Sequence, residues 1–100
     1  MTLFSVLMPM RNAAPFVEAA LLSVLEQDVD LEVVVVDDGS TDGSGAKARG
    51  LGDARVRVVP GPQRGIAAAF NAGLAEARGE LIARCDADDF YVPGRLKWQG

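Results

Sequence analysis

The chain contains no histidine and a single cysteine, Cys85. A lone cysteine cannot form an internal disulfide, which favours a reducing compartment, so we expect a cytoplasmic protein. Cys85 lies in an apolar run, which is typical of a buried thiol rather than a reactive one. Without histidine or a reactive thiolate, any metal bound by this chain would have oxygen ligands.

Long hydrophobic runs and clusters of basic residues are also missing. The apolar stretch in MTLFSVLMPMRN has no basic residues before it and is shorter than the ~20 residues of a membrane span. It predicts a strand rather than a signal peptide. Acidic and basic residues are interspersed at a net charge of −4, so we expect no nucleic acid partner. Association of a longer protein with the cytoplasmic face of a membrane stays open.

Apolar residues are abundant. With 49% hydrophobic and 24% charged residues among 100, the chain has enough apolar surface to fold as one globular domain, residues 1–100. The last residues, VPGRLKWQG, are typical of the start of a further helix. We therefore expect the amino-terminal part of a longer enzyme.

Four apolar runs predict strands, and two helical patterns lie between them. The run LEVVVV shows no polar alternation, which is typical of a strand buried on both faces of a parallel sheet. Asn12 and Pro15 predict a capped start for the first helix. A third helix, short and weakly indicated, is expected at Ser44–Arg49. The predicted strands are Phe4–Met8, Leu31–Val36, Val56–Val59 and Leu81–Cys85, and the longer helices are Pro15–Gln27 and Ile66–Ala77.

This alternation predicts an α/β fold with an open, doubly wound parallel sheet. Right-handed crossovers between sequential neighbours give the strand order 3-2-1-4. Ligands of such sheets bind beyond the carboxyl ends of the strands, where the strand order reverses. The segments that follow three of the predicted strands there are polar: Pro9 to Asn12, Asp37 to Ser40, and Asp86 to Asp89.

The segment RCDADDFYVPGRL contains three carboxylates within four residues. In an extended segment Asp86 and Asp88 project to the same side, so both can reach one bound species. Carboxylate oxygens suit Mg²⁺ or Mn²⁺, with substrate phosphates and water as the other ligands. The alternative is a solvated turn, in which Asp89 helps to start the next helix. The D-x-D pattern alone does not decide between them.

Two further segments carry candidate binding residues. An aspartate that ends a buried strand, as Asp37 and Asp38 do, can accept a hydrogen bond from a base or a sugar hydroxyl. The residues of DDGSTD are also the ones that turns favour. Arg64 and Gly65 directly precede the predicted helix Ile66–Ala77. They could bind an anion through guanidinium and backbone N–H groups, or form an ordinary connector.

Three stretches in this order resemble the amino-terminal, nucleotide-binding part of family 2 glycosyltransferases of the GT-A fold. They are SVLMPMRNAAPFVEAALLSVLEQ, EVVVVDDGSTDGS and RGIAAAFNAGLAEARGELIARCDADD, and the resemblance runs from about Phe4 to Leu96. It implies that the chain is an enzyme fragment that binds a nucleotide-diphosphate sugar, with a UDP-sugar favoured. Arg11 departs from the family pattern, in which an aromatic residue is common, so the base identity is open.

The resemblance also implies a role for each candidate residue. Asp38 would accept from the pyrimidine ring with Asp37 supporting it, and Asp88 would bind the cation that bridges the donor diphosphate. The remaining donor-site residues are Pro9 and Arg11 at the base, Asp86 near the ribose, and Arg64, Gly65 and Asn71 shaping the donor pocket.

The implied reaction is metal-dependent transfer of the sugar to an acceptor hydroxyl, either of a saccharide or of a lipid-linked molecule. It needs a general base, which in this family is a carboxylate well past the D-x-D, beyond residue 100. We therefore expect these residues alone to be inactive. The alternatives are a non-catalytic nucleotide- or metal-binding module and a sugar-phosphate nucleotidyltransferase. The latter would need a Gly-rich basic loop after the first strand, where this chain has PMRN.

Overall fold

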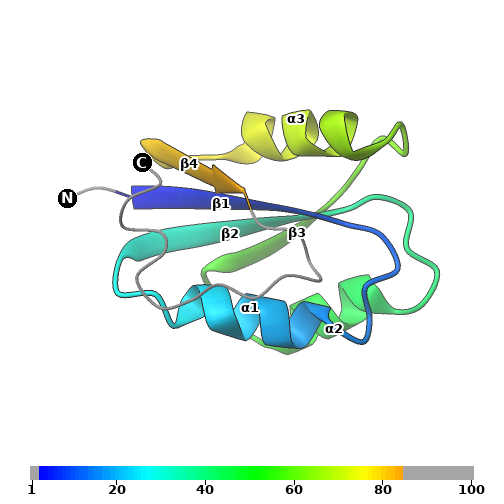
Figure 1. The fold of residues 1–100 in the computed structure, drawn as a ribbon, viewed down its shortest axis with the longest axis horizontal. Coiled ribbons are helices and arrows are strands. Elements are labelled where there is room, and N and C mark those ends of the chain that lie inside the picture. The colour runs from blue at the N-terminus through cyan, green and yellow to red at the C-terminus, as the bar shows by residue number, and fades with distance from the viewer. Residues whose placement is uncertain (1–2, 85–100) are drawn as a thin grey trace.

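The computed structural model describes residues 3–84, which form an open four-stranded sheet with helices on both faces (Figure 1). All strand pairs are parallel and the order is β3-β2-β1-β4. The predicted α/β class and strand order 3-2-1-4 are therefore confirmed. The elements are β1 (Leu3–Met10), α1 (Val17–Leu25), β2 (Asp30–Asp37), α2 (Ser44–Gly50), β3 (Val56–Pro60), α3 (Ile66–Glu76) and β4 (Leu81–Arg84).

The helices cover the two faces of the sheet unequally. Helices α1 and α2 lie on one face and α3 on the other (Figure 1). The larger core cluster fills the first face, and a smaller one, built around Leu7, Val34, Val36 and Ala69, lies under α3. Because the chain winds from β1 to β3 with helices on one face and then crosses to β4 on the other, the strand order reverses between β1 and β4.

Strand β2 is an inner strand of the sheet, and six of its eight residues are buried. Its four consecutive valines, Val33 to Val36, are 0% exposed. Successive side chains point to opposite faces, so Val33 and Val35 belong to the core under α1 and α2, whereas Val34 and Val36 lie under α3. The uniformly apolar run is thus explained by helices on both faces of the sheet.

Two local expectations about the helices were wrong. Helix α1 has no side-chain cap; the Asn12 side chain instead accepts a hydrogen bond from the backbone N–H of Thr41, at 2.8 Å. On α3, the spacing of Ile66, Phe70, Gly73, Leu74 and Ala77 predicts a single inner stripe, but Leu74 is 43% exposed, while Ala69 is fully buried. Ala69 and Ala72 pack in the smaller core, and a Cβ at Gly73 would lie 2.9 Å from Val36 Cγ2, so small residues bring α3 close to the sheet.

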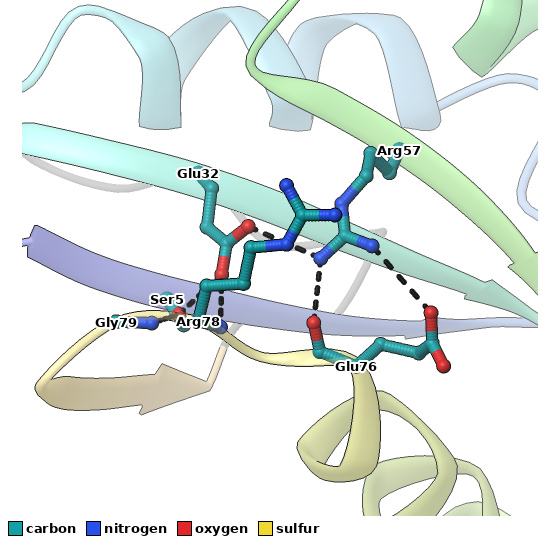
Figure 2. A network of polar contacts seen from close by, with 6 residues as sticks. All are labelled: Ser5, Glu32, Arg57, Glu76, Arg78 and Gly79. Atoms are coloured by element: carbon teal, nitrogen blue, oxygen red, sulfur yellow. Dashed lines mark hydrogen bonds and ion pairs between the residues drawn. The ribbon is translucent and has the colours of Figure 1, made fainter.

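A buried glutamate, Glu32, lies inside β2. The apolar pattern of this strand did not predict a role for it. Glu32 is 8% exposed, and its carboxylate accepts hydrogen bonds from the Ser5 hydroxyl at 2.6 Å and the Arg78 N–H at 2.6 Å. Arg57 adds an ion pair at 3.1 Å and also donates to the Glu76 carbonyl (Figure 2). This network joins three strands to the segment that connects α3 to β4.

The protonation of Glu32 follows from its surroundings. Burial raises the pKa of the Glu32 carboxyl, but hydrogen bonds from Ser5, from the Arg78 N–H and from Arg57, with the Arg57 charge, outweigh burial and lower it. A carboxyl whose pKa is lower in the folded state stabilises the fold fully above its unfolded value, about 4.3. That stabilisation is lost as the pH falls from about 4.3 through the folded pKa.

We expect Glu32→Gln to lower stability at pH 7 by about 1 to 3 kcal/mol, because an amide cannot accept from all of these donors. The variant should also lose less stability than wild type below about pH 4.3, since it lacks the linked proton. Urea unfolding at pH 7 and in the acid range measures both effects. Glu26→Gln, at an exposed residue that ends α1, is the control and should behave as wild type. Equal acid sensitivity of Glu32→Gln and wild type would contradict this role.

Candidate functional site

The carboxyl ends of the strands, toward the right in Figure 1, gather most of the candidate residues. Pro9 is buried near the end of β1, and Arg11 follows, exposed, in the next loop. Asp37 ends β2 and Asp38 follows it, while Arg64 and Gly65 are exposed directly before α3. Of the remaining candidates, Asn71 is exposed on α3, and Asp86, Asp88 and Asp89 lie outside the described residues.

Asp38 is more deeply buried than its neighbour Asp37. It is 7% exposed, its Oδ1 accepts from the Gln63 N–H at 2.5 Å, and its backbone N–H donates to the Met10 carbonyl at 2.8 Å. Its other oxygen, Oδ2, accepts no hydrogen bond from any residue between 3 and 84. Leaving a buried acceptor unpaired costs about 1 to 3 kcal/mol, so this oxygen is suited to a donor from a ligand.

Asp37 has a different local role. Its Oδ1 accepts from the Ser40 N–H at 3.0 Å, which closes the turn after β2, and its carbonyl accepts from the Gly61 N–H at 2.9 Å. These contacts tie the turn after β2 to the connection after β3. The arrangement agrees with a supporting role for Asp37 beside Asp38, and the turn chemistry weighed from the sequence is present as well.

Two glycines leave room for the two carboxylates. A Cβ at Gly61 would lie 2.6 Å from Asp38 Oδ1, and a Cβ at Gly45 would lie 2.5 Å from Asp37 Oδ2. Real Cβ atoms do not approach that closely, so a side chain at either position would displace the carboxylate behind it. The glycines that follow β2 and β3 therefore shape the edge of the sheet.

The loops after β1 and β2 are joined by hydrogen bonds that sequence reasoning missed. The backbone N–H groups of Asn12, Ala13 and Ala14 donate in turn to Ser40 Oγ at 3.0 Å, Ser44 Oγ at 2.9 Å and Asp42 Oδ2 at 3.0 Å. The signal in the sequence is the concentration of oxygen-bearing side chains in STDGS, which was assigned only to turn chemistry.

Asp42 is the charged member of this set. A short hydrogen bond from the Ser44 hydroxyl, together with those from the Ala14 and Ser44 N–H groups, lowers the pKa of the Asp42 carboxyl although burial opposes it. The carboxylate therefore stays ionised at neutral pH. An ionised acceptor makes stronger hydrogen bonds to backbone N–H groups than a neutral one.

The start of α3 adds backbone donors at the same edge. Gln63 and Gly65 have positive φ angles of 57° and 98°, so the chain turns sharply on both sides of Arg64. The first N–H groups of a helix lack intrahelical partners. Arg64 is exposed beside them, and its anion-binding role stays a prediction.

No group of three His, Cys, Asp or Glu side chains that could hold a metal ion comes together within residues 3–84. The predicted ligand Asp88 lies outside that range. Within it, no helix has the length and hydropathy needed to cross a membrane.

A hollow of about 380 Å³ opens at the opposite edge of the sheet. It is lined by Leu3, Val29, Asp30, Leu31 and Arg55, near the amino ends of the strands. None of the candidate donor-binding residues contributes to it, and ligands of this sheet type bind at the carboxyl ends. We therefore do not assign the hollow to the candidate site.

Comparisons with known proteins agree with the fold. The succinoglycan biosynthesis protein ExoU of Rhizobium meliloti is 46% identical over 89 residues, which is 86% of this chain and 26% of that protein. The structure of the mannosyltransferase PcManGT from Pyrobaculum calidifontis, in complex with GDP-Man and Mn²⁺, is 36% identical. It has a TM-score of 0.81 and covers 88% of this chain and 28% of its own.

A third relative is TarS from S. aureus, residues 1–349, in complex with UDP-GlcNAc. It is 31% identical with a TM-score of 0.86, over 97% of this chain and 29% of that one. The chain thus spans between a quarter and a third of these relatives' length. The family model described as glycosyl transferase family 2 matches residues 5–98. The sequence left a glycosyltransferase and a sugar-phosphate nucleotidyltransferase as alternatives, and this match favours the glycosyltransferase. The chain belongs to glycosyl transferase family 2.

Proposed function

We propose that this chain is the donor-binding part of a glycosyltransferase that transfers a sugar from a nucleotide-diphosphate sugar, with a UDP-sugar favoured, to an acceptor hydroxyl. The observation that carries the proposal is the buried Asp38 carboxylate at the carboxyl edge of the sheet. One of its oxygens is held by the Gln63 N–H, and the other has no donor within the described residues.

The chemistry of Asp38 fits the ring N–H of a nucleobase. A fixed carboxylate oxygen accepts strongly from such a donor, and uracil and guanine both carry a ring N–H beside a carbonyl. The solved relatives contain UDP-GlcNAc in one case and GDP-Man in the other. Arg11, exposed in the loop next to Asp38, supplies guanidinium N–H groups that suit the base carbonyl or stack on the ring.

The diphosphate and its cation are assigned to the neighbouring residues. Arg64 and Gly65 would meet the phosphates at the start of α3, with Asp86 near the ribose and Asp88 holding Mg²⁺ or Mn²⁺. The donor set fits such an ion because it consists of carboxylate oxygens in a chain without histidine. A bound divalent ion supplies charge neutralisation for the departing nucleoside diphosphate.

The rest of the reaction is assigned to the part of the protein beyond residue 100. Attack on the anomeric carbon requires a base that removes the proton of the acceptor hydroxyl. In this proposal that base and the acceptor site belong to the longer protein, which is cytoplasmic. Its donor half and its acceptor half share one crevice.

Titration calorimetry with UDP tests the donor and metal assignments together. We expect Mn²⁺ to tighten UDP binding by about tenfold or more, which corresponds to ~1.4 kcal/mol. Asp88→Asn should abolish this gain, because it removes the charged ligand. Asp89→Asn is the matched control, since the neighbouring carboxylate is assigned to the start of a helix, and it should retain the gain. Parallel titrations with GDP identify the base.

Two outcomes would contradict the proposal. If neither UDP nor GDP binds with or without metal, the donor-site assignment fails. If UDP binds equally well without Mn²⁺ and Asp88→Asn changes nothing, the metal assignment fails while nucleotide binding stands.

A further inference from the structure

The alternating polar side chains after Asp38 hold the loop that carries Arg11. Three consecutive backbone N–H groups, those of residues 12–14, donate to three side chains spaced two residues apart, Ser40, Asp42 and Ser44. The Lys47 ammonium donates to the Ala14 carbonyl at 3.2 Å. The loop after β1 is thus fixed by side chains of the loop after β2.

This clamp acts on the residue next to it in the chain. Arg11 is exposed, and residues 3–84 provide no hydrogen-bond or ion-pair partner for its guanidinium, so its position depends on the backbone that follows. Asn12 holds a φ angle of 53°, in the left-handed region that few residues adopt without support. Its own N–H and side chain both bond the loop after β2, which supplies that support.

The clamp also sets the separation of the two base-binding candidates. Asp38 is anchored to the end of β1 by its N–H bond to Met10, and Arg11 directly follows Met10. Pinning the loop over residues 12–14 therefore fixes the Arg11 backbone relative to the Asp38 carboxylate. A preorganised pair binds a ligand without first losing the freedom of a mobile loop.

We propose that Asp42, with Ser40 and Ser44, is a positioning residue for nucleotide binding: it holds the loop after β1 so that Arg11 meets the base that Asp38 binds. The inference rests on the proposed donor-binding function. Asp42 is exposed on the surface and belongs to neither core cluster, so its loss removes loop order rather than core packing.

A double-mutant cycle on the intact protein tests the proposal, with UDP affinity measured by calorimetry in Mn²⁺. We expect Asp42→Ala to weaken UDP binding by about tenfold, as loss of a charge-assisted hydrogen bond does. In the Arg11→Ala background, the same change should have less than about a twofold effect, because the residue that it positions is gone. A residue that only stabilises the fold would weaken binding equally in both backgrounds.

Asp53→Ala is the matched control. Asp53 is also a loop aspartate, bonded to the Arg55 N–H and guanidinium, with its pKa lowered to about 2 chiefly by the Arg55 side chain. It precedes β3 at the far edge of the sheet, so its loss should leave UDP affinity unchanged. Ser40→Ala, which removes only the Asn12 contact, provides a second cycle should Asp42→Ala fail to fold.

Each outcome bears on the inference. Effects of Asp42→Ala and Arg11→Ala that simply add, or an Asp42→Ala variant with wild-type affinity, overturn it while the donor site stands. If Asp42→Ala does not fold, additive effects of Ser40→Ala and Arg11→Ala overturn it in the same way. A wild-type protein that binds neither UDP nor GDP overturns the proposed function, and this inference with it.

Discussion

Val35→Asp is expected to abolish folding of this domain. Val35 is 0% exposed in β2, an inner strand of the sheet, and packs in the core under α1 and α2. A carboxylate there would have no cation or hydrogen-bond donor within the core, and burying an unpaired charge costs more than the total stability of a small domain. Circular dichroism and urea titration should show no cooperative unfolding transition.

Leu22→Asp is the control for the added charge. Leu22 is 50% exposed on α1, so the same substitution there should change stability by no more than about 0.5 kcal/mol. A soluble Val35→Asp protein with a cooperative transition near that of wild type would contradict the position of β2 inside the sheet.

Asp38→Ala is expected to lower UDP affinity about 100-fold, because a hydrogen bond to a buried charged group contributes about 1.5 to 3 kcal/mol. Asp38→Asn should bind with intermediate affinity. Its single amide oxygen can accept from Gln63 or from the base, whereas the carboxylate accepts from both. Calorimetry gives the affinities, and thermal unfolding shows how much stability is lost with the Gln63 contact.

Asp30→Ala is the matched control on the same strand. Asp30 is exposed at the amino end of β2, at the opposite edge of the sheet from Asp38, so its removal should not alter UDP binding. Equal affinities for wild type and Asp38→Ala would remove the observation on which the donor site rests.

The fold was predictable because its signals are local. Apolar runs and helical stripes alternate along the chain, and the right-handed crossover rule then leaves few topologies. The buried run in β2 predicted its position between two helical layers. The edge at which the polar segments gather was predictable for the same reason, since these segments follow the strands directly.

Details of the helices were less predictable. The expected stripe on α3 included Leu74, but Leu74 is exposed. The smaller residues Ala69 and Ala72 pack in the core under α3 instead. Asn12 has the residue type of a helix cap, yet the loop after β2 offered its side chain the Thr41 N–H instead. In both cases local propensity was overridden by a competing tertiary contact.

The sequence by itself determined the class of fold, the strand order and the edge at which the candidate residues gather, because these follow from periodicity and chain direction. Only the tertiary structure decided the partners of the polar groups. Glu32 receives its bonds from Ser5 and Arg78, which are 27 and 46 residues away, and Asp42 bonds Ala14 across 28 residues. Hydrogen bonds between residues so far apart produce no periodic pattern in the sequence. They form only once the sheet has brought the loops together.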